Sequence, residues 1–376
     1  MIYRDFGKTG IKVPALGFGC MRLPMTEKDG KQMVDDELAT PLMKRAVELG
    51  INFFDTHWFY CNFDSQRAVG AALHSIRDKV HLSSKIMLHL IEKPEDFIDY
   101  LRRALDLMQL EYIDFYHFPA LSYKTYQDKV LGLKLIDQAE KAKSIGLMRH
   151  LSMSFHSDVD KMHELIDTGA FSTLLGQYNI VDRRNEDIFA YAKSKGLGTM
   201  VMGPLMGGAL SDGGQQFLEC MGSGASSATE MALRFVWGHP GVDMVLSGMN
   251  TLQELEENVR YAENADSIPG EERQALIERS HELKELNDLY CTNCNYCHVC
   301  PEKISIGWIF TQYLRHKIWG LDESVRKRLA SGIIWNNVRY KGPEACTECG
   351  LCLNACPQKI NIPSELKRVW PILSKL

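Results

Sequence analysis

Short apolar runs alternate with longer amphipathic segments between about residues 10 and 265. The segments between the runs carry apolar residues every three or four positions, as helices do, and several end in glycine, which often closes a helix. Strands that alternate with helices pair in parallel through helical crossovers. Eight runs have the length and composition of strands: 13–21, 51–57, 80–87, 112–118, 147–155, 173–179, 198–205 and 242–249.

Eight strand–helix units in about 250 residues predict an α/β fold of the (β/α)8 TIM-barrel type. The alternative is an open, doubly wound sheet, which is expected to carry a G-x-G-x-x-G turn after its first strand. The first strand here ends in GFGCMRLP (17–24), which has two glycines and no third. The barrel is therefore favoured, and its active site is expected at the C-terminal ends of the strands.

Four polar side chains stand where the second, third and fourth strands should end: Asp55, Tyr60, Lys85 and His117. A phenol is a poor acid at neutral pH, but a neighbouring ammonium favours the phenolate, and a buried carboxylate keeps the ammonium charged. Tyr60 is thus the expected general acid/base for a carbonyl oxygen, which His117 would orient. Singly, these residues are equally typical of helix caps or structural contacts. The rings around them are expected to form the pocket wall: His57, Trp58, Phe59 and Phe118.

The 11 cysteines are unevenly distributed, because three lie in residues 1–290 and eight in the last 86. The eight form the groups C-x2-C-x2-C-x2-C-P (291–301) and C-x2-C-x2-C-x3-C-P (346–357). Zinc, the alternative, usually takes two pairs of ligands separated by a loop, whereas cysteines at three-residue steps before proline are the bacterial ferredoxin pattern. In that pattern the fourth cysteine of each run binds the other cluster. Two [4Fe–4S] clusters are expected, one on Cys291, Cys294, Cys297 and Cys356, the other on Cys346, Cys349, Cys352 and Cys300.

Composition limits the remaining possibilities. With 376 residues, 45% of them hydrophobic, and a net charge of −5, the chain is neither collagenous nor disordered, and it gives no reason to expect nucleic acid as a partner. No apolar run approaches the roughly 18 residues of a membrane span, and the first residues lack a signal-peptide core. Grouped thiols also indicate a reducing compartment rather than a disulfide framework. A cytoplasmic protein without a membrane partner is expected.

Three segments follow from these patterns. Residues 1–265 are expected to form the barrel, 266–290 a charged helical connector, and 291–376 a mostly α-helical, ferredoxin-like iron–sulfur domain. The 45 residues between the two cysteine groups carry helical patterns at 306–318 and 321–332. The glycine- and serine-rich stretch 208–227 is expected to be a loop beside the barrel mouth.

On these residues the chain resembles the aldo-keto reductase family. INFFDTHWFY (51–60) matches the family's D-T-x-x-x-Y element, LSSKI (82–86) its lysine strand and YIDFYHF (112–118) its histidine strand. The opening YRDFGKTGIKVPALGFGCMRL is similar to its N-terminal hairpin and first strand. The resemblance covers about residues 2–265 in order and spacing. With the cysteine module, the chain resembles the subgroup that carries a C-terminal dicluster ferredoxin domain.

The resemblance implies a nicotinamide cofactor across the barrel mouth. Family members that prefer NADP usually place basic residues within 247–258, where this chain has SGMNTLQELEEN, with Glu254 at a position often held by arginine. Because a carboxylate repels a phosphate, either NAD(H) is favoured over NADP(H), or dinucleotide binding is weak and the electrons arrive by another route. The matching cofactor positions are Ser154, Gln177 and Asn179 for the carboxamide, Pro204, Leu205, Gly207 and Gly248 for the phosphates and adenosine, and Glu257 and Asn258 for the adenine edge.

The expected function is that of an oxidoreductase, an enzyme of the aldo-keto-reductase type, which interconverts a carbonyl and an alcohol of a small molecule. The clusters would allow electron exchange with a one-electron carrier protein, or they are structural. Two alternatives stay open. The chain is a redox-sensing or electron-transfer subunit with a non-catalytic barrel, or an isomerase that retains its cofactor and has no net redox change.

Overall fold

The computed structural model describes residues 1–156, 161–212, 214–265, 268–286, 289–291, 293–294, 296–335 and 338–376. Parts of the predicted connector, at 266–267 and 287–288, lie outside the described residues. The chain divides into two compact units. Unit 1 comprises Met1–Tyr178, Arg184–Met202 and Val236–Ser267, and unit 2 comprises Asn179–Arg183, Gly203–Phe235 and Ile268–Leu376.

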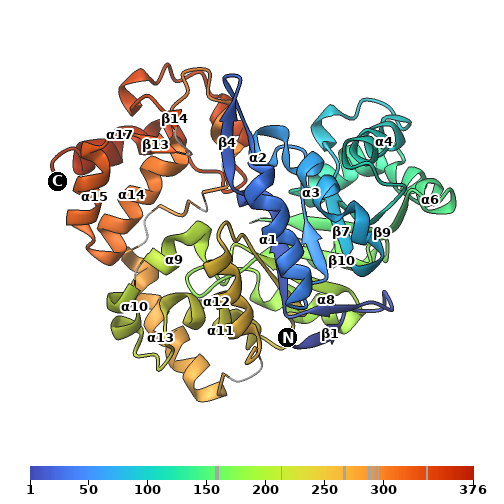
Figure 1. Cartoon of the computed structure of the whole chain (residues 1–376), viewed down its shortest axis with the longest axis horizontal. Helices are drawn as coiled ribbons and strands as arrows, with labels where there is room; N and C mark the ends of the chain where they lie inside the picture. Colours follow the sequence, from blue (N-terminus) through green and yellow to red (C-terminus); the bar gives the residue numbers. More distant parts are fainter. Residues whose placement is uncertain are drawn as a thin grey trace. The chain divides into compact units, whose positions relative to one another are not determined.

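Unit 1 contains a closed barrel of eight parallel strands, as predicted (Figure 1). The strands follow one another around the barrel in the order β10-β11-β12-β3-β6-β7-β8-β9. Each lies inside one of the predicted apolar runs, so the predicted fold class is confirmed. The bounds are β3 (Leu16–Gly19), β6 (Phe53–Asp55), β7 (His81–Lys85), β8 (Ile113–Phe118), β9 (Met148–Phe155), β10 (Thr173–Gln177), β11 (Gly198–Met202) and β12 (Met244–Ser247).

Helices follow the strands and bury one apolar face each. In α4 the buried residues Phe97, Leu101, Leu105 and Met108 recur at helical spacing. Side chains fix several helix starts: Asp35 accepts hydrogen bonds from the amides of residues 37 and 38 at the start of α1. The main helices are α1 (Asp36–Glu48), α3 (Ser65–Leu73), α4 (Asp96–Met108), α6 (Leu135–Ser144), α7 (Met162–Asp167), α8 (Glu186–Lys195), α11 (Ala228–Trp237) and α12 (Leu252–Ala262).

The N-terminal end of the barrel is closed by apolar rings. The antiparallel hairpin β1 (Tyr3–Asp5) and β2 (Lys12–Pro14) carries Phe6 in its loop. The ring of Phe6 packs edge-on against Phe53 and Phe115, with centroids 5.8 and 5.3 Å apart. Because this end is filled, the polar residues are left to the opposite, C-terminal end of the strands.

A second hairpin was not predicted from the sequence. Strands β4 (Met25–Lys28) and β5 (Lys31–Val34) pair antiparallel around Asp29 and Gly30, whose φ angles are 52° and 72°. Both values are left-handed, as a type I′ turn requires, and Asp-Gly is the usual sequence signal for that turn. The strands are short and largely outside the core, so their apolar pattern is weak.

Unit 2 is mostly helical and is built around α14 (Ile306–Trp319), whose Phe310 and Tyr313 pack with Leu366 and Val369 of α17 (Ile362–Leu373). Helix α15 (Asp322–Ala330) also contacts α14, and both helices coincide with the predicted patterns at 306–318 and 321–332 (Figure 1). The short elements near the cysteines are η6 (Tyr296–Val299), η7 (Pro343–Ala345), α16 (Leu351–Ala355) and the pair β13 (Ile334–Trp335) and β14 (Val338–Arg339).

The prediction of a loop at 208–227 is wrong. The stretch contains α9 (Ala209–Asp212) and α10 (Gly214–Met221), and α10 packs against α13 (Gly270–Leu286). Leu218 and Met221 are buried, and this apolar pair outweighs the flanking glycines and serines. Within the described ranges, no helix combines the length and apolar character that a membrane crossing requires.

Candidate active site and cysteine clusters

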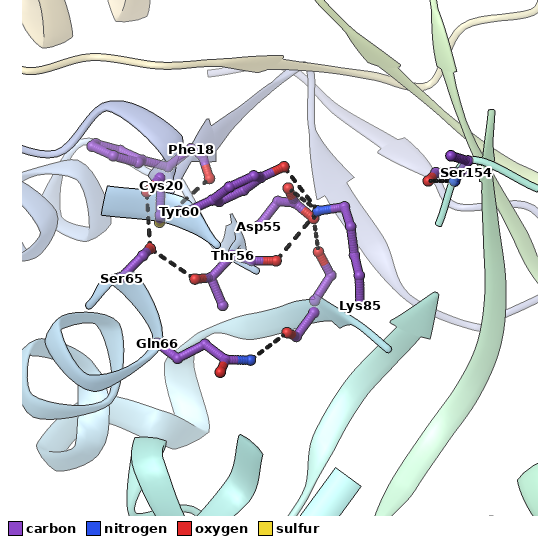
Figure 2. Close-up of polar contacts among 12 residues, drawn as sticks. Phe18, Cys20, Asp55, Thr56, Tyr60, Ser65, Gln66, Lys85 and Ser154 are labelled. Carbon is purple, nitrogen blue, oxygen red and sulfur yellow. Dashed lines mark hydrogen bonds and ion pairs between the residues drawn. The ribbon is translucent and has the colours of Figure 1, made fainter. Parts of the chain in front are cut away.

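Three neighbouring strands bring the predicted tetrad together at the C-terminal end of the barrel. Asp55 is the last residue of β6, Lys85 the last of β7, and His117 the fifth of the six residues of β8. In the parallel register Asp55 stands beside Ser83, and Lys85 beside His117. Tyr60 begins the short helix α2 (Tyr60–Phe63) in the loop after β6. Figure 2 shows the Lys85 ammonium reaching toward both Asp55 and Tyr60.

The Lys85 ammonium is the centre of the site. Its Nζ lies 2.8 and 2.6 Å from the two Asp55 carboxylate oxygens and donates to the Tyr60 hydroxyl oxygen at 3.2 Å. It also donates to the Thr56 carbonyl at 3.3 Å. An ammonium has three hydrogens, so these contacts occupy its donors. The donors of Lys85 are therefore all engaged within the protein, by Asp55, Thr56 and Tyr60.

Burial strengthens the direct attraction between the Asp55 and Lys85 charges, because the protein around them screens charges less than water does. Asp55 and Lys85 are 3% and 4% exposed, and each compensates the charge of the other. The Ser83 hydroxyl donates to Asp55 Oδ1 at 2.6 Å and helps fix the carboxylate. Sequence reasoning missed Ser83 and the Thr56 carbonyl. Ser83 precedes Lys85 by two residues on the same strand, so the two-residue period of a strand points both side chains the same way.

Two buried histidines lie beside the ion pair. His117 is fully buried, and burial, with the Lys85 charge, lowers its pKa from 6.5 to about 4. His57 is 1% exposed, and burial, then the charge of Lys85, holds its pKa well below the usual value. Both imidazoles are therefore neutral at pH 7. The rings of His57 and Tyr60 meet edge to face with centroids 5.4 Å apart.

The chain after Tyr60 has an unusual backbone. Cys61, Asn62 and Phe63 have φ values of 53°, 55° and 70°, all in the left-handed region. For residues other than glycine this region costs about 1–2 kcal/mol each. Such strain persists only where the surroundings impose it, and it concentrates at functional sites. The turn sets where Tyr60 stands relative to Lys85.

Aromatic rings pack together as a wall beside Tyr60, and the expectation that His57, Trp58 and Phe59 line the substrate pocket stays a prediction. Phe59 packs against His57 with centroids 4.6 Å apart and stacks on His89 at 6.3 Å. Phe63 extends the wall and is 60% exposed. The expectation for Phe118 is wrong. Its ring packs instead on Phe97 of α4 and on Phe171, because successive residues of a strand face opposite sides.

The cofactor positions that were expected in unit 1 lie near the same ends of their strands. Ser154 is the penultimate residue of β9, and its Oγ accepts from the Ala120 amide at 3.3 Å (Figure 2). Gln177 ends β10 and is buried. Gly248 follows β12, where an added Cβ would come within 3.3 Å of the Arg22 side chain.

The two positions expected at the adenine edge lie in α12. The Asn258 amide donates to Ser247 Oγ at 3.1 Å, and Glu257 accepts from Gln253 at 3.0 Å.

The other cofactor positions lie in unit 2. Pro204 and Leu205 follow β11, and Gly207, in the left-handed conformation, belongs to η5 (Met206–Gly208). The Asn179 amide already has protein partners on both its atoms. Its Nδ2 donates to the Gly203 carbonyl at 2.9 Å and to the Tyr290 hydroxyl at 3.1 Å. Its Oδ1 accepts from the amides of residues 181 and 182 at 3.0 and 2.8 Å, so a cofactor contact would replace one of these bonds.

Glu254 has a structural role at the start of α12. The Thr251 hydroxyl accepts from the Glu254 amide at 3.1 Å, and the Glu254 carboxylate accepts from the Asn250 amide at 2.8 Å. This pair is a variant of the capping box, in which the carboxylate accepts from the amide of Asn250, one residue before the N-cap Thr251. Glu254 is exposed, so its charge remains available to an approaching phosphate.

The eight clustered cysteines line two hollows of unit 2. Cys291, Cys294, Cys297 and Cys356 line a hollow of about 330 Å³, and Cys300, Cys346, Cys349 and Cys352 line another of about 340 Å³. The fourth cysteine of each sequence motif thus faces the hollow of the other motif. Apolar side chains complete both walls, among them Ile306, which lines both.

Each hollow brings four cysteine sulfurs together, which is the donor set of a [4Fe–4S] cluster. Burial raises the pKa of the Cys297 thiol, and the nearby Cys291, Cys294 and Cys356 raise it further because they surround the same space. The Asn293 amide donates to the Cys291 sulfur at 3.4 Å. Across the described part of the chain, no three His, Cys, Asp or Glu side chains are arranged to hold one metal ion.

Comparison with known proteins agrees with this architecture. Residues 15–272 match the family model for the aldo/keto reductase family, and residues 290–361 match the model for a 4Fe-4S dicluster domain. L-galactose dehydrogenase of Arabidopsis thaliana is 26% identical over 76% of this chain and 95% of its own. The uncharacterized oxidoreductase YqkF of Bacillus subtilis is 24% identical over 75% and 97%. The structure of aldo-keto reductase AKR11C1 from Bacillus halodurans (holo form) is 25% identical over 74% and 96%, with a TM-score of 0.62.

Proposed function

The chain belongs to the aldo/keto reductase family, and on this premise we propose that it interconverts a carbonyl and an alcohol of a small molecule, with Tyr60 as the general acid/base. One observation carries the proposal. The buried Lys85 ammonium joins the Asp55 carboxylate to the Tyr60 hydroxyl. A barrel that served only as a binding module would have no need for a buried charge beside a phenol.

Each member of the tetrad has a distinct part. The Tyr60 oxygen accepts the bond from Lys85, so the phenol keeps its own hydrogen to donate to a carbonyl oxygen. The phenolate that remains is stabilised by the ammonium, which Asp55 holds in place. The neutral imidazole of His117 can donate one hydrogen bond to the same oxygen. For alcohol oxidation the proton returns to Tyr60 by the same path.

The hydride requires a nicotinamide. When bound, it would supply or accept the hydride, and Ser154, Gln177 and Asn179 are the proposed contacts for its carboxamide. Pro204, Leu205, Gly207 and Gly248, then Glu257 and Asn258, are proposed for the rest of the dinucleotide. NAD(H) is proposed over NADP(H), because Glu254 would face the additional phosphate with a negative charge.

Two [4Fe–4S] clusters are proposed for the two hollows, and they would supply one-electron transfer. Cys291, Cys294, Cys297 and Cys356 would hold one, and Cys300, Cys346, Cys349 and Cys352 the other. A one-electron carrier protein is the proposed partner, and a reducing, cytoplasmic location follows from the need for eight free thiols. Electron paramagnetic resonance of the anaerobic protein, with substrate and NADH added, tests this part. Signals from reduced clusters are expected, and silence during turnover would favour purely structural clusters.

Replacement of Tyr60 tests the central proposal. Tyr60→Phe removes only the hydroxyl, so the rate of carbonyl reduction should fall by roughly 10²–10⁴-fold while NADH binding stays intact. Tyr100→Phe, on helix α4, is the matched control and should leave the rate unchanged. If Tyr60→Phe keeps full turnover, the barrel is not a reductase of this kind. A redox-sensing subunit or an isomerase with retained cofactor would then be favoured.

A further inference from the structure

The buried His57 has polar atoms that the tetrad does not use. Both its ring nitrogens are shielded from solvent, and neither has a hydrogen-bond partner among the described residues. Buried polar groups of native proteins nearly always have partners, because a donor or acceptor that loses water without replacement is costly. A buried imidazole without protein partners is expected to form hydrogen bonds either with a bound ligand or with ordered water.

The position of His57 is that of a substrate contact. The rings of His57 and Tyr60 meet edge to face with centroids 5.4 Å apart. Burial lowers the pKa of His57, and Lys85, His117 and His89 lie close enough to lower it further. The Lys85 donors are occupied by Asp55, Thr56 and Tyr60. His57 also packs on the ring of Phe59, with the two ring centroids 4.6 Å apart. His57 therefore lies next to the tetrad, beside the residue that is proposed to hold the carbonyl oxygen.

The chemistry of this position selects a hydroxyl. A neutral imidazole offers one N–H donor and one nitrogen acceptor, and an alcohol hydroxyl both accepts and donates. A carboxylate substrate is disfavoured, because it would need a cation and the nearby Lys85 is already paired with Asp55. His117 offers a second neutral imidazole. Both its nitrogens are shielded from solvent without a well-formed hydrogen bond in the described chain, and a weaker hydrogen bond with the Met153 backbone acts to raise its pKa.

We propose that His57 and His117 form a two-imidazole subsite for two neighbouring oxygens, which makes an α-hydroxy carbonyl, or a vicinal diol in the reverse direction, the substrate class. His117 holds the carbonyl oxygen with Tyr60, and His57 holds the adjacent hydroxyl. This inference rests on the proposed carbonyl–alcohol function and adds to it the class of substrate. The wall of Phe59, Phe63 and His89 packs on the apolar side of the same molecule.

An isosteric pair of substrates tests the subsite in the full-length protein with its clusters. Hydroxyacetone and butanone differ by a hydroxyl in place of a methyl group, so they occupy similar space. In the wild type kcat/KM should favour hydroxyacetone by tenfold or more. His57→Phe should remove most of this preference by slowing hydroxyacetone, while butanone changes by less than about threefold. Since the hydroxyl also alters the reactivity of the carbonyl, the change in the ratio is the readout.

Two further variants complete the design. His57→Asn keeps one donor and one acceptor and should retain part of the preference, whereas His163→Phe, in α7, where the ring packs on Tyr191, should leave the ratio unchanged. An unchanged ratio in His57→Phe would overturn the subsite and leave the reductase proposal intact. Loss of all turnover in the wild type would instead contradict the proposed function.

The subsite remains testable by binding and stability. With NADH present, 1,2-propanediol should quench tryptophan fluorescence in the wild type, and His57→Phe should bind it at least several-fold more weakly. The melting temperature of His57→Phe should equal or exceed that of the wild type, because an unpartnered polar ring is replaced by an apolar one. Equal binding by both proteins, or a large fall in the melting temperature, would assign His57 a structural role only.

Discussion

Asn179 Nδ2 donates to the hydroxyl of Tyr290 at 3.1 Å, which links the turn after β10 to the residue directly before the first cluster cysteine, Cys291. Asn179 is fully buried, and its amide is held by the backbone of residues 181, 182 and 203 as well. A nicotinamide carboxamide at Asn179, which the family resemblance implies, would have to compete with Tyr290 for the same N–H group.

Tyr290→Phe should therefore raise the affinity for NADH by several-fold, because it releases one donor of Asn179 while leaving the other three bonds. Asn179→Ala should weaken binding, since it removes the amide and loosens the turn at 179–182. Titration of NADH by fluorescence measures both, with iron content as the control for an intact cluster. Unchanged or weaker binding in Tyr290→Phe would show that Asn179 holds the turn and not the cofactor.

Glu254 provides a separate test of dinucleotide choice. Glu254→Gln keeps a side chain that can complete the capping box with the Asn250 amide but removes the charge. The preference for NADH over NADPH should fall by about two- to tenfold, because the pair is solvent-exposed, and the effect should shrink as salt is added. Kd values for both dinucleotides in the wild type and the variant measure the change.

Comparison with Glu254→Ala distinguishes the effect of the carboxylate charge on dinucleotide binding from its contribution to the start of α12. It removes both, so it should alter the dinucleotide preference as Glu254→Gln does but also lower the free energy of unfolding by about 1 kcal/mol. A wild type that binds NADPH more tightly than NADH would refute the proposed preference at once.

The regular parts of the fold were predictable because their patterns are long and repeated. All eight barrel strands and the helices α14 and α15 lie where apolar periodicity placed them. The hairpin β4–β5 was missed because its strands are short and mostly exposed, so only Asp29-Gly30 signals it. The helix α10 was missed because glycines and serines surround Leu218 and Met221, and the burial of these two residues within unit 2 is not visible in composition.

The candidate site was predictable only for residues that carry a known pattern. Asp55, Lys85 and His117 converge as expected because they stand at or next to the ends of adjacent strands, and Tyr60 follows in the loop after β6. His57 was interpreted as pocket wall, since nothing in the sequence shows that its nitrogens lack protein partners. Likewise, Glu254 matched a cofactor position while its capping bonds depend on where α12 begins. Hydrogen-bond satisfaction is a property of packing, which one sequence does not reveal.

The depressed pKa of His117 predicts how stability depends on pH. Between the ordinary imidazole pKa of about 6.5 and the folded value of about 4, the unfolded chain binds a proton that the folded chain does not. The free energy of unfolding should therefore fall as pH falls through this window, by roughly 3 kcal/mol from this residue. The pKa values of His57 and His156 are also lowered, so these residues likewise reduce the free energy of unfolding as pH falls.

Urea unfolding of the wild type and of His117→Asn, at several values between pH 7.5 and pH 4 under anaerobic conditions, measures this contribution. Effects of acid on the clusters are common to both proteins, so the difference between them isolates His117. The free energy of unfolding of the wild type minus that of His117→Asn should decrease as pH falls. Parallel curves would mean that His117 is already protonated, or is solvated, in the folded protein.

The crossed arrangement of the cysteines gives the sharpest test of unit 2. Cys356 shares a hollow with Cys291, Cys294 and Cys297, although its own sequence motif begins at Cys346. Each intact [4Fe–4S] cluster contributes four iron atoms, so the wild type should hold about eight. Cys356→Ser/Cys291→Ser should lose one cluster and keep about four iron atoms, because both residues serve the same site. Cys356→Ser/Cys346→Ser should lose both clusters. If each motif instead held its own cluster, the two double variants would exchange their iron contents, and anaerobic iron and sulfide analysis distinguishes the two patterns.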